Sequence, residues 1–408
     1  MRSWKIAAVG TAAVALATVA GLALFSGTGQ AATAALGSNW YASAPYVMPE
    51  DNSPPDVAAV MDATGQKAFQ LAFILDSGGC TPSWGGTSPI SSDTAAGALI
   101  NTVRSKGGDV SVSIGGYGGT KLGQNCGSPA ATAAAYQQVI SKYSLHAIDF
   151  DLEEPEYEND AAVNNELGAA QILQRNNSGL YVSVTMPGTT SGAGYFGTLL
   201  LDKSKTLGFT PDNFSIMPFD GGFNGATDQI NALESFHGLL ESHLGWSSAT
   251  AYAHEGASLM NGRSDTGEFF RQADFQSVLN YATSHGLARF TFWAVNRDRQ
   301  CSPPDNNGQT SGVCSSVTQN SWDFTKYSAT FAGATPPTSG PSSSPTAPPP
   351  PTSAPPGGGC SAAAWSATTT YNGGAVVSYG SHQWTAKWWS YGDIPGGPAG
   401  VWADNGAC

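Results

Sequence analysis

The sequence predicts an α/β fold for the larger part of the chain, a (β/α)8 barrel of the TIM type, followed by a small all-β domain. Between residues 36 and 331, short apolar or aromatic runs alternate with helical stretches. Strands that alternate with helices form a parallel sheet with right-handed crossovers. The region has about the length of one barrel, and a stretch without large apolar residues, 335–359, separates it from residues 360–408.

Barrel strands are expected where apolar, β-branched or aromatic residues run together: 39–47, 69–75, 110–114, 147–152, 181–186, 214–219 and 290–295. Helices are expected between several of them, at 130–143, 161–174 and 275–284. One further strand is expected within 250–260, although His254 and Glu255 interrupt its apolar pattern.

The first 31 residues have the features of a signal peptide. Arg2 and Lys5 precede a long apolar run, and small residues follow up to Ala31, where cleavage is expected. An uncleaved anchor is the alternative, since about twenty apolar residues span a bilayer. The small residues favour cleavage, so we expect an extracellular, secreted protein that is not held in a membrane.

The cysteine content fits an exported chain. The chain has six cysteines, and an even number in such a protein indicates disulfides. None forms a Cys-x-x-Cys pair, which argues against a zinc ribbon or a thioredoxin-like redox site. Six cysteines allow fifteen pairings. The domain boundaries favour three pairs: Cys80–Cys126, Cys301–Cys314 and Cys360–Cys408.

The charge of the chain limits its partners. The sequence has 30 Asp and Glu against 17 Lys and Arg, and a formal net charge of −13. A strongly anionic protein does not attract phosphate backbones or anionic lipids. We therefore expect a neutral or cationic partner, such as a glycan, and no nucleic acid. The histidines lack metal-ligand spacing with cysteines or acids, so we expect no metal ion and no cofactor.

The two C-terminal segments differ sharply in composition. Residues 335–359 are nearly all Pro, Ser, Thr, Ala and Gly, which is typical of an extended linker. Residues 360–408 are instead rich in large aromatics: Trp365, Tyr371, Tyr379, Trp384, Trp388, Trp389, Tyr391 and Trp402. So small a core cannot bury them all, and exposed aromatic rings stack on sugars. The alternative is a Trp-rich core without a ligand.

An acidic strand carries the strongest functional signal. Side chains alternate along a strand, so Asp149, Asp151 and Glu153 share one face, roughly 6–7 Å apart in succession. Crowded carboxylates raise one another's pKa, and Glu153 falls at the carboxyl end, where barrel active sites lie. A protonated Glu there is a candidate general acid. The alternatives are a solvated edge strand or a Ca²⁺ or Mg²⁺ site.

Three motifs, in this order, resemble those of the family 18 glycoside hydrolases, the chitinases with a TIM barrel. They are Ser113-Ile114-Gly115-Gly116, Asp149-x-Asp151-x-Glu153 and Phe292-Trp293. The resemblance implies that Glu153 protonates the glycosidic oxygen and that the substrate's own N-acetyl carbonyl is the nucleophile. It also implies that Asp151 orients the acetamido group and that Asp149 tunes Asp151.

The resemblance implies substrate-binding residues as well. Met217-Pro218-Phe219-Asp220 is similar to the family's Met-x-Tyr-Asp, which suggests that Met217, Phe219 and Asp220 contact the sugar. Trp293 is expected to floor the subsite next to the scissile bond, and Ser113 belongs to the second motif. Tyr117 follows a strand end and is a candidate for lining the cleft. Trp84 is a weaker candidate for the cleft.

Two positions depart from the family pattern. The family usually has Asp where His146 stands and Tyr where Phe219 stands. The first position is expected to support the site and to influence its pH profile. The second loses a hydroxyl group, which predicts a reduced rate.

Residues 360–408 resemble the family 5/12 carbohydrate-binding modules found on bacterial chitinases, with Trp388, Trp389 and Tyr391 as the expected stacking surface. Together these motifs predict a bacterial chitinase whose partners are chitin and chito-oligosaccharides, and the single linker with one tethered module indicates a monomer. An endo-β-N-acetylglucosaminidase that acts on N-glycans and a non-catalytic chitin-binding protein are the alternatives.

Overall fold

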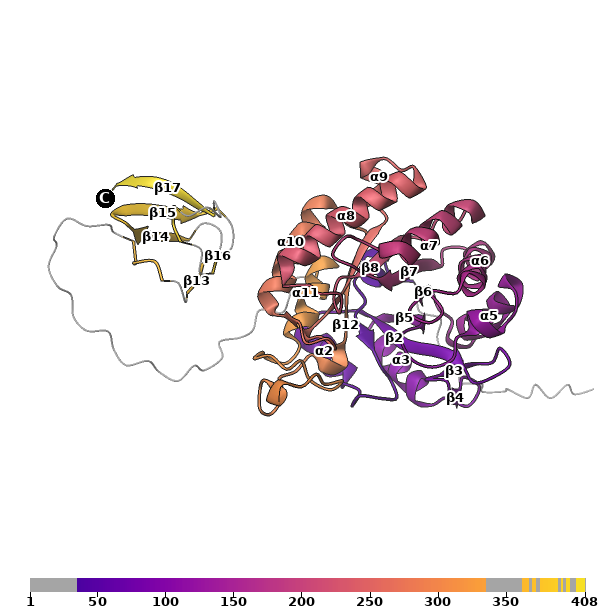
Figure 1. Cartoon of the computed structure of the whole chain (residues 1–408). Coiled ribbons are helices and arrows are strands. Elements are labelled where there is room, and N and C mark those ends of the chain that lie inside the picture. The colour runs from indigo at the N-terminus through magenta and orange to yellow at the C-terminus, as the bar shows by residue number, and fades with distance from the viewer. Residues whose placement is uncertain are drawn as a thin grey trace, which may run out of the picture. The chain divides into compact units, whose positions relative to one another are not determined.

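The computed structural model describes residues 35–334, 362–366, 369–371, 375–387, 390–391, 394–396 and 401–407. The chain divides into two compact units between positions 338 and 339 (Figure 1). The signal peptide expected at 1–31 and the linker expected at 335–359 lie outside the described residues.

The first unit is built around eight parallel strands in chain order: β1 (Tyr46–Val47), β2 (Ala68–Asp76), β5 (Asp109–Gly115), β6 (Ala147–Asp151), β7 (Tyr181–Pro187), β8 (Asn213–Met217), β9 (Glu255–Met260) and β12 (Arg289–Trp293). Each strand pairs with the next along the chain. The ring confirms the predicted barrel.

The ring closes between β12 and β1 through side chains. Among the described residues these two strands share no ladder pairing, but they lie beside each other. The hydroxyl of Thr291 donates to the carbonyl of Ala44 at 2.5 Å, and the amide of Asn296 accepts from the Met48 N–H at 2.9 Å and donates to its carbonyl at 3.1 Å. Side chains at this seam therefore replace backbone hydrogen bonds.

Helices surround the strands (Figure 1). The longer ones are α2 (Val57–Thr64), α3 (Ala95–Ser105), α5 (Pro129–Tyr143), α6 (Asp160–Asn176), α7 (Gly194–Leu207), α8 (Ala226–Leu244), α10 (Gln272–His285) and α11 (Asp323–Phe331). Short elements complete the unit: α1 (Ser38–Ala42), α4 (Leu122–Asn125), α9 (Ser248–Tyr252), η1 (Val295–Arg297), η2 (Asn306–Gly308), and the antiparallel strands β3 (Pro82–Trp84), β4 (Ser88–Pro89), β10 (Gly262–Arg263) and β11 (Phe269–Phe270). None of the described helices has the length and apolar character that a membrane crossing requires.

Local chemistry explains where the helices begin. The α5 helix begins at Pro129. The hydroxyl of the preceding residue, Ser128, caps the helix by accepting a hydrogen bond from the N–H of Ala131. The side chain of Asn159 caps α6 in the same way. The core lies between helices and strands, where Phe150 of β6 meets the Tyr136 ring of α5 edge-on at 5.7 Å. The apolar face of the acidic strand thus faces the helices, as its alternation predicts.

Three strand predictions were wrong in part. Residues 38–42 form α1 instead of a strand, and this turn carries the Tyr41 hydroxyl to Asp109 at 2.7 Å. Residues 248–252 form α9, with Ser247 as its cap, and only the second half of 250–260 is a strand. The strand predicted at 214–219 ends at Met217, before Pro218, which has no N–H for the ladder.

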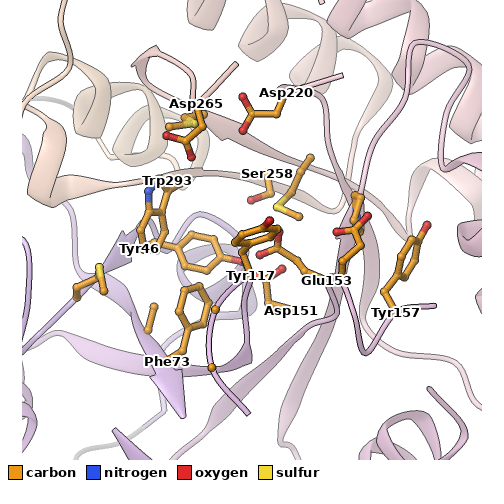
Figure 2. A pocket seen from close by; sticks show the side chains of 18 of the residues that line it. Tyr46, Phe73, Tyr117, Asp151, Glu153, Tyr157, Asp220, Ser258, Asp265 and Trp293 are labelled. Carbon is orange, nitrogen blue, oxygen red and sulfur yellow. The ribbon is translucent and has the colours of Figure 1, made fainter. Parts of the chain in front are cut away.

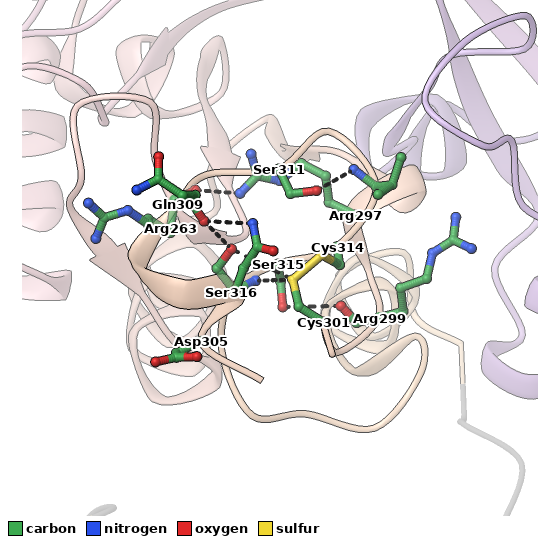
Figure 3. The surroundings of a disulfide bond; sticks show 12 residues. Arg263, Arg297, Arg299, Cys301, Asp305, Gln309, Ser311, Cys314, Ser315 and Ser316 are labelled. Carbon is green, nitrogen blue, oxygen red and sulfur yellow. Dashed lines mark hydrogen bonds between the residues drawn. A yellow bond between two sulfur atoms is a disulfide. The ribbon is translucent and has the colours of Figure 1, made fainter. Parts of the chain in front are cut away.

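Two disulfides of the first unit confirm predicted pairs, Cys80–Cys126 and Cys301–Cys314. The second closes a loop that follows η1 (Figure 3). Next to it, the N–H of Ser316 donates to the sulfur of Cys301 at 3.2 Å, and the carbonyl of Ser315 accepts from the N–H of Arg263 at 2.8 Å. The loop is therefore tied to β10. The third predicted pair, Cys360–Cys408, lies outside the described residues.

The second unit contains only β-structure among its described residues. One sheet pairs β13 (Thr370–Tyr371) with β16 (Ser390–Tyr391), and the other has the order β14 (Val376–Tyr379), β15 (His382–Ala386) and β17 (Trp402–Ala407). Trp402 lies in the small core and Trp384 packs against it. Trp388 and Trp389 lie outside the described residues, and Tyr391 belongs to β16.

Candidate active site

A cavity of about 1270 Å³ opens at the carboxyl ends of the barrel strands. Figure 2 shows Asp151 and Glu153 side by side in it, with Tyr117, Asp220 and Trp293 around them. The predicted site residues on its wall are Tyr117, Asp151, Glu153, Met217, Phe219, Asp220 and Trp293. Trp84, the weaker candidate, lines it too. The structure therefore brings together side chains from five barrel strands and the loops that follow them.

Asp149 does not reach the cavity. It is fully buried inside the barrel, where it forms an ion pair with Arg289 at 2.6 Å. Its two oxygens also accept hydrogen bonds from the side chains of Tyr46, Gln70, Ser113, Ser183 and Thr185. So many donors hold its charge in place.

Ser113 is placed differently from the sequence-based expectation. It is fully buried and its hydroxyl donates to Asp149 at 2.8 Å, and it is not among the residues that line the cavity. It supports Asp149 from the neighbouring strand and does not reach the cavity wall. The glycines after it do meet the cavity wall, because a Cβ on Gly116 would lie 2.7 Å from the Phe73 ring. Close packing thus explains the glycines of this motif.

Asp151 is the deepest carboxyl group of the cavity. One of its oxygens accepts from the Tyr46 hydroxyl at 3.0 Å, and the other is buried without a partner among the described residues. Burial raises the pKa of this carboxyl well above its usual value, and the charges of Glu153 and Asp149 raise it further. An unpartnered oxygen in this position is available to a ligand.

Glu153 lies in the loop after β6, two residues beyond Asp151. Its backbone carbonyl accepts from the N–H of Tyr157 at 2.9 Å, which fixes the turn. Burial raises the pKa of Glu153 to about 7, against the opposing charge of Lys121, and Glu154 adds to the rise. The side chain therefore holds a proton up to near-neutral pH and has the property of a general acid.

Aromatic rings form the floor of the cavity. Trp293 stacks on Phe73 with ring centres 5.5 Å apart and planes inclined by 10°, and the edge of Tyr46 meets it at 5.7 Å. Beside the floor, Asp220 accepts hydrogen bonds from the N–H of Thr266 at 2.9 Å and from its hydroxyl at 3.1 Å. A broad ring next to two acids suits a sugar.

The sequence analysis missed the groups that hold the two aspartates. The most important are Tyr46, which bonds both of them, and Arg289. A signal for Arg289 was present, since alternation along β12 places it on the same face as Trp293. Tyr46 follows a proline in a strand of two residues and gives no such pattern.

His146 does not lie near the cavity. It precedes β6, at the opposite end of the strand from Glu153, and its ring nitrogen contacts Asp109 at 2.8 Å. Asp109 also pairs with Arg104. No contact among the described residues links His146 to the active site, so the structure offers no path for the expected influence on the pH profile. His146 belongs to a polar cluster at the amino-terminal end of the barrel strands.

Comparison with known proteins identifies relatives, although no protein-family model matches the chain. It is 27% identical over 276 residues to a probable bifunctional chitinase/lysozyme of Escherichia coli (strain K12), which covers 62% of this chain and 30% of that protein. It is 26% identical over 274 residues to Endochitinase 11 of Metarhizium anisopliae, covering 62% and 52%. The chain thus matches about a third and about half of the length of these relatives.

The catalytic domain of a hyperthermophilic chitinase from Pyrococcus furiosus has a similar structure. The TM-score is 0.64 at 25% identity, and the match covers 71% of this chain and 94% of that domain. Site mutants of an active domain of a Pyrococcus furiosus chitinase, solved with chito-oligosaccharides, match with the same TM-score at 24% identity and the same coverage of each chain. In both sequence and fold, the first unit of this chain is therefore similar to chitinase catalytic domains.

Proposed function

We propose that the chain is a secreted chitinase, which hydrolyses the β-1,4 linkages of N-acetylglucosamine polymers with retention of configuration. One observation carries the proposal: a buried aspartate with an unpartnered oxygen, Asp151, stands beside a protonated acid, Glu153, above an aromatic floor. The names of the relatives support the substrate.

In the first step, Glu153 donates its proton to the oxygen of the scissile bond. The carbonyl oxygen of the substrate's own acetamido group attacks the anomeric carbon as that bond breaks, which forms a cyclic oxazolinium ion. The free oxygen of Asp151 accepts the acetamido N–H and offsets the positive charge that develops. No carboxylate of the protein bonds to the sugar.

In the second step, the deprotonated Glu153 removes a proton from water, and the water oxygen opens the ring at the anomeric carbon. Two displacements at this carbon restore its original configuration. Asp149 and Arg289 lie behind Asp151 and keep it in place through Tyr46, which bonds both aspartates. Asp220 and Phe219, on the cavity wall, contact the same sugar.

Two further parts of the proposal concern the rest of the chain. Residues 1–31 direct export, and residues 360–408 bind solid chitin through exposed aromatic rings, with the linker as a tether. A tethered module raises the local concentration of the enzyme on an insoluble substrate. The aromatic content of this segment supports its role.

The variant Glu153→Gln tests the mechanism. It keeps the size of the side chain and removes the proton, so kcat on chito-oligosaccharides should fall by about a hundredfold or more while binding persists. Glu158→Gln is the matched control, because Glu158 is an exposed carboxyl in the same turn. Full turnover by Glu153→Gln would refute the assignment. A parallel assay on a high-mannose glycopeptide decides between chitin and N-glycans.

A further inference from the structure

A buried lysine lies directly behind the cavity. Lys121 precedes α4, and only 1% of its surface is exposed. Its ammonium group donates to the carbonyl of Gly116 and to that of Gly118 at 2.8 Å. A buried ammonium is costly unless it is paired or fully hydrogen-bonded, so both carbonyls are held tightly.

The two carbonyls flank Tyr117, which lines the cavity and has 75% of its surface exposed. The surrounding loop is rich in glycine, and Gly116 and Gly119 have positive φ angles of 79° and 75°. Glycine leaves a loop with many accessible conformations. The hydrogen bonds from Lys121 therefore restrain a loop whose glycines have no side chains to hold it in place.

Four carboxyl groups surround the ammonium charge. Asp151 and Glu153 belong to the cavity, and Glu156 and Glu166 lie behind it, fully buried. Their negative charges favour the charged form of Lys121, against the burial that lowers its pKa. The charge of Lys121 thus acts on both the catalytic carboxyls and a second pair of acids.

The two acids of that second pair, Glu156 and Glu166, lie close together. A Cβ on Gly123 would touch an oxygen of both Glu156 and Glu166, so the two carboxyl groups converge on this glycine. Glu166 accepts from the Tyr136 hydroxyl at 2.6 Å, and the carboxyl group of Glu156 interacts with that of Glu166. Burial raises the pKa of Glu166 to about 7 and that of Glu156 well above its usual value, so the pair retains a proton near pH 7.

We propose that Lys121 is a positioning residue of the proposed glycosidase: it holds the carbonyls of Gly116 and Gly118 so that Tyr117 forms a fixed platform for a sugar ring beside Glu153. This inference rests on the proposed function. Figure 2 shows the Tyr117 ring over the same cavity as Asp151 and Glu153. A held ring stacks on a sugar without the entropy cost of first ordering the loop.

The variant Lys121→Met tests the role, with Lys142→Met, on the exposed end of α5, as the control. On soluble chito-oligosaccharides we expect KM to rise about fivefold, the worth of one aromatic stack. The alkaline limb of the kcat profile should move to higher pH, because the lost positive charge no longer lowers the pKa of Glu153. If Lys121 only stabilised the fold, the alkaline limb of the kcat profile would stay unchanged in Lys121→Met.

A double-mutant cycle locates the effect on KM. If Lys121 acts through Tyr117, Lys121→Met should change KM little once Tyr117→Ala is present. Equal effects in both backgrounds would overturn the proposal. Lys121→Arg keeps the charge but does not fit both carbonyls, so it should raise KM without moving the pH limb. If Lys121→Met fails to fold, Lys121→Arg still tests whether the hydrogen bonds to the two carbonyls affect KM.

Hydrogen exchange separates this proposal from the proposed function. The backbone amides of residues 116–120 should exchange faster in Lys121→Met and in Lys121→Arg than in the wild type, with or without enzymatic activity. Unchanged exchange would refute the positioning role even in an active chitinase. An inactive wild type with faster loop exchange in the variants would refute the proposed function alone.

Discussion

Asp149 holds the site through contacts that converge on a single carboxylate. Its donors come from β1, β2, β5, β7 and β12, and the charged one is Arg289. Tyr46 extends this set by bonding Asp151 as well. The motif suggests an electrostatic role for Asp149. Its contacts show that it also links five strands of the barrel.

Removing Arg289 tests this centre. Arg289→Met leaves Asp149 buried without its cation, which should lower the free energy of unfolding by roughly 3–5 kcal/mol. Chemical denaturation measures the change. Arg175→Met, on the exposed face of α6, is the matched control and should have an effect near zero. A loss below about 1 kcal/mol for Arg289→Met would show that the ion pair is not needed.

The pKa of Glu153 predicts the pH profile of hydrolysis. Burial raises this pKa to about 7, and the general acid must be protonated to act. Activity should therefore fall above about pH 7, by roughly tenfold per pH unit, as Glu153 loses its proton. A kcat profile on soluble oligosaccharides, with stability checked at each pH, measures this limb. Constant activity to pH 9 would contradict the assignment of Glu153 as the acid.

Among the elements, β9 has an unusual beginning. Its first residue, Glu255, is fully buried against α8, where one oxygen contacts the His237 ring at 3.2 Å and the other has no partner in the described residues. This acid is what interrupted the apolar pattern in the sequence. A buried carboxyl at the start of a barrel strand, remote from the cavity, affects folding and not chemistry.

Glu255 should make stability depend on pH. Burial, and then the charge of Glu234, raises its pKa from 4.5 to about 9. Between these values the folded state holds a proton that the unfolded state has released, so stability falls as pH rises through this window. Between pH 5 and pH 8, the free energy of unfolding of the wild type should fall by on the order of 1–3 kcal/mol more than that of Glu255→Gln, because glutamine does not titrate. Denaturation of both proteins at several pH values measures it, and parallel curves would contradict the prediction.

Elements with a strong internal pattern were predictable. The strands β2, β5, β6, β7 and β12 carry long apolar runs, and the structure places them within a residue or two of the sequence-based bounds. The two-residue β1 and the β3–β4 hairpin were not predictable, because pairing with β2 defines them. The same holds in the cavity: motifs indicated Glu153 and Trp293, but Phe73 lies there only because the barrel folds it under Trp293.

For the whole molecule, the chain combines a barrel with a small β unit. The barrel alone corresponds to the solved chitinase catalytic domain, which the match covers almost entirely. The second unit has a small core, formed around Val377 and Trp402. If the second unit serves as the proposed anchor, hydrolysis of soluble substrates needs the first unit only.

Deleting residues 335–408 tests that division. Activity on solid chitin should fall much more than activity on soluble oligosaccharides, because the proposed tethered module would raise the enzyme concentration only at a surface. The ratio of the two rates, before and after deletion, is the measurement. Equal losses on both substrates would argue against anchoring and for a stabilising role of the second unit.

The seam between β12 and β1 has a consequence for how the enzyme fails when heated. These strands are joined by the side chains of Thr291 and Asn296, and they carry the two rings, Trp293 and Tyr46, that meet in the cavity. Bonds at the seam are fewer than in a backbone ladder, so this part of the ring opens at lower free energy. On warming, we therefore expect the affinity for the sugar to weaken at a lower temperature than that at which the whole barrel unfolds.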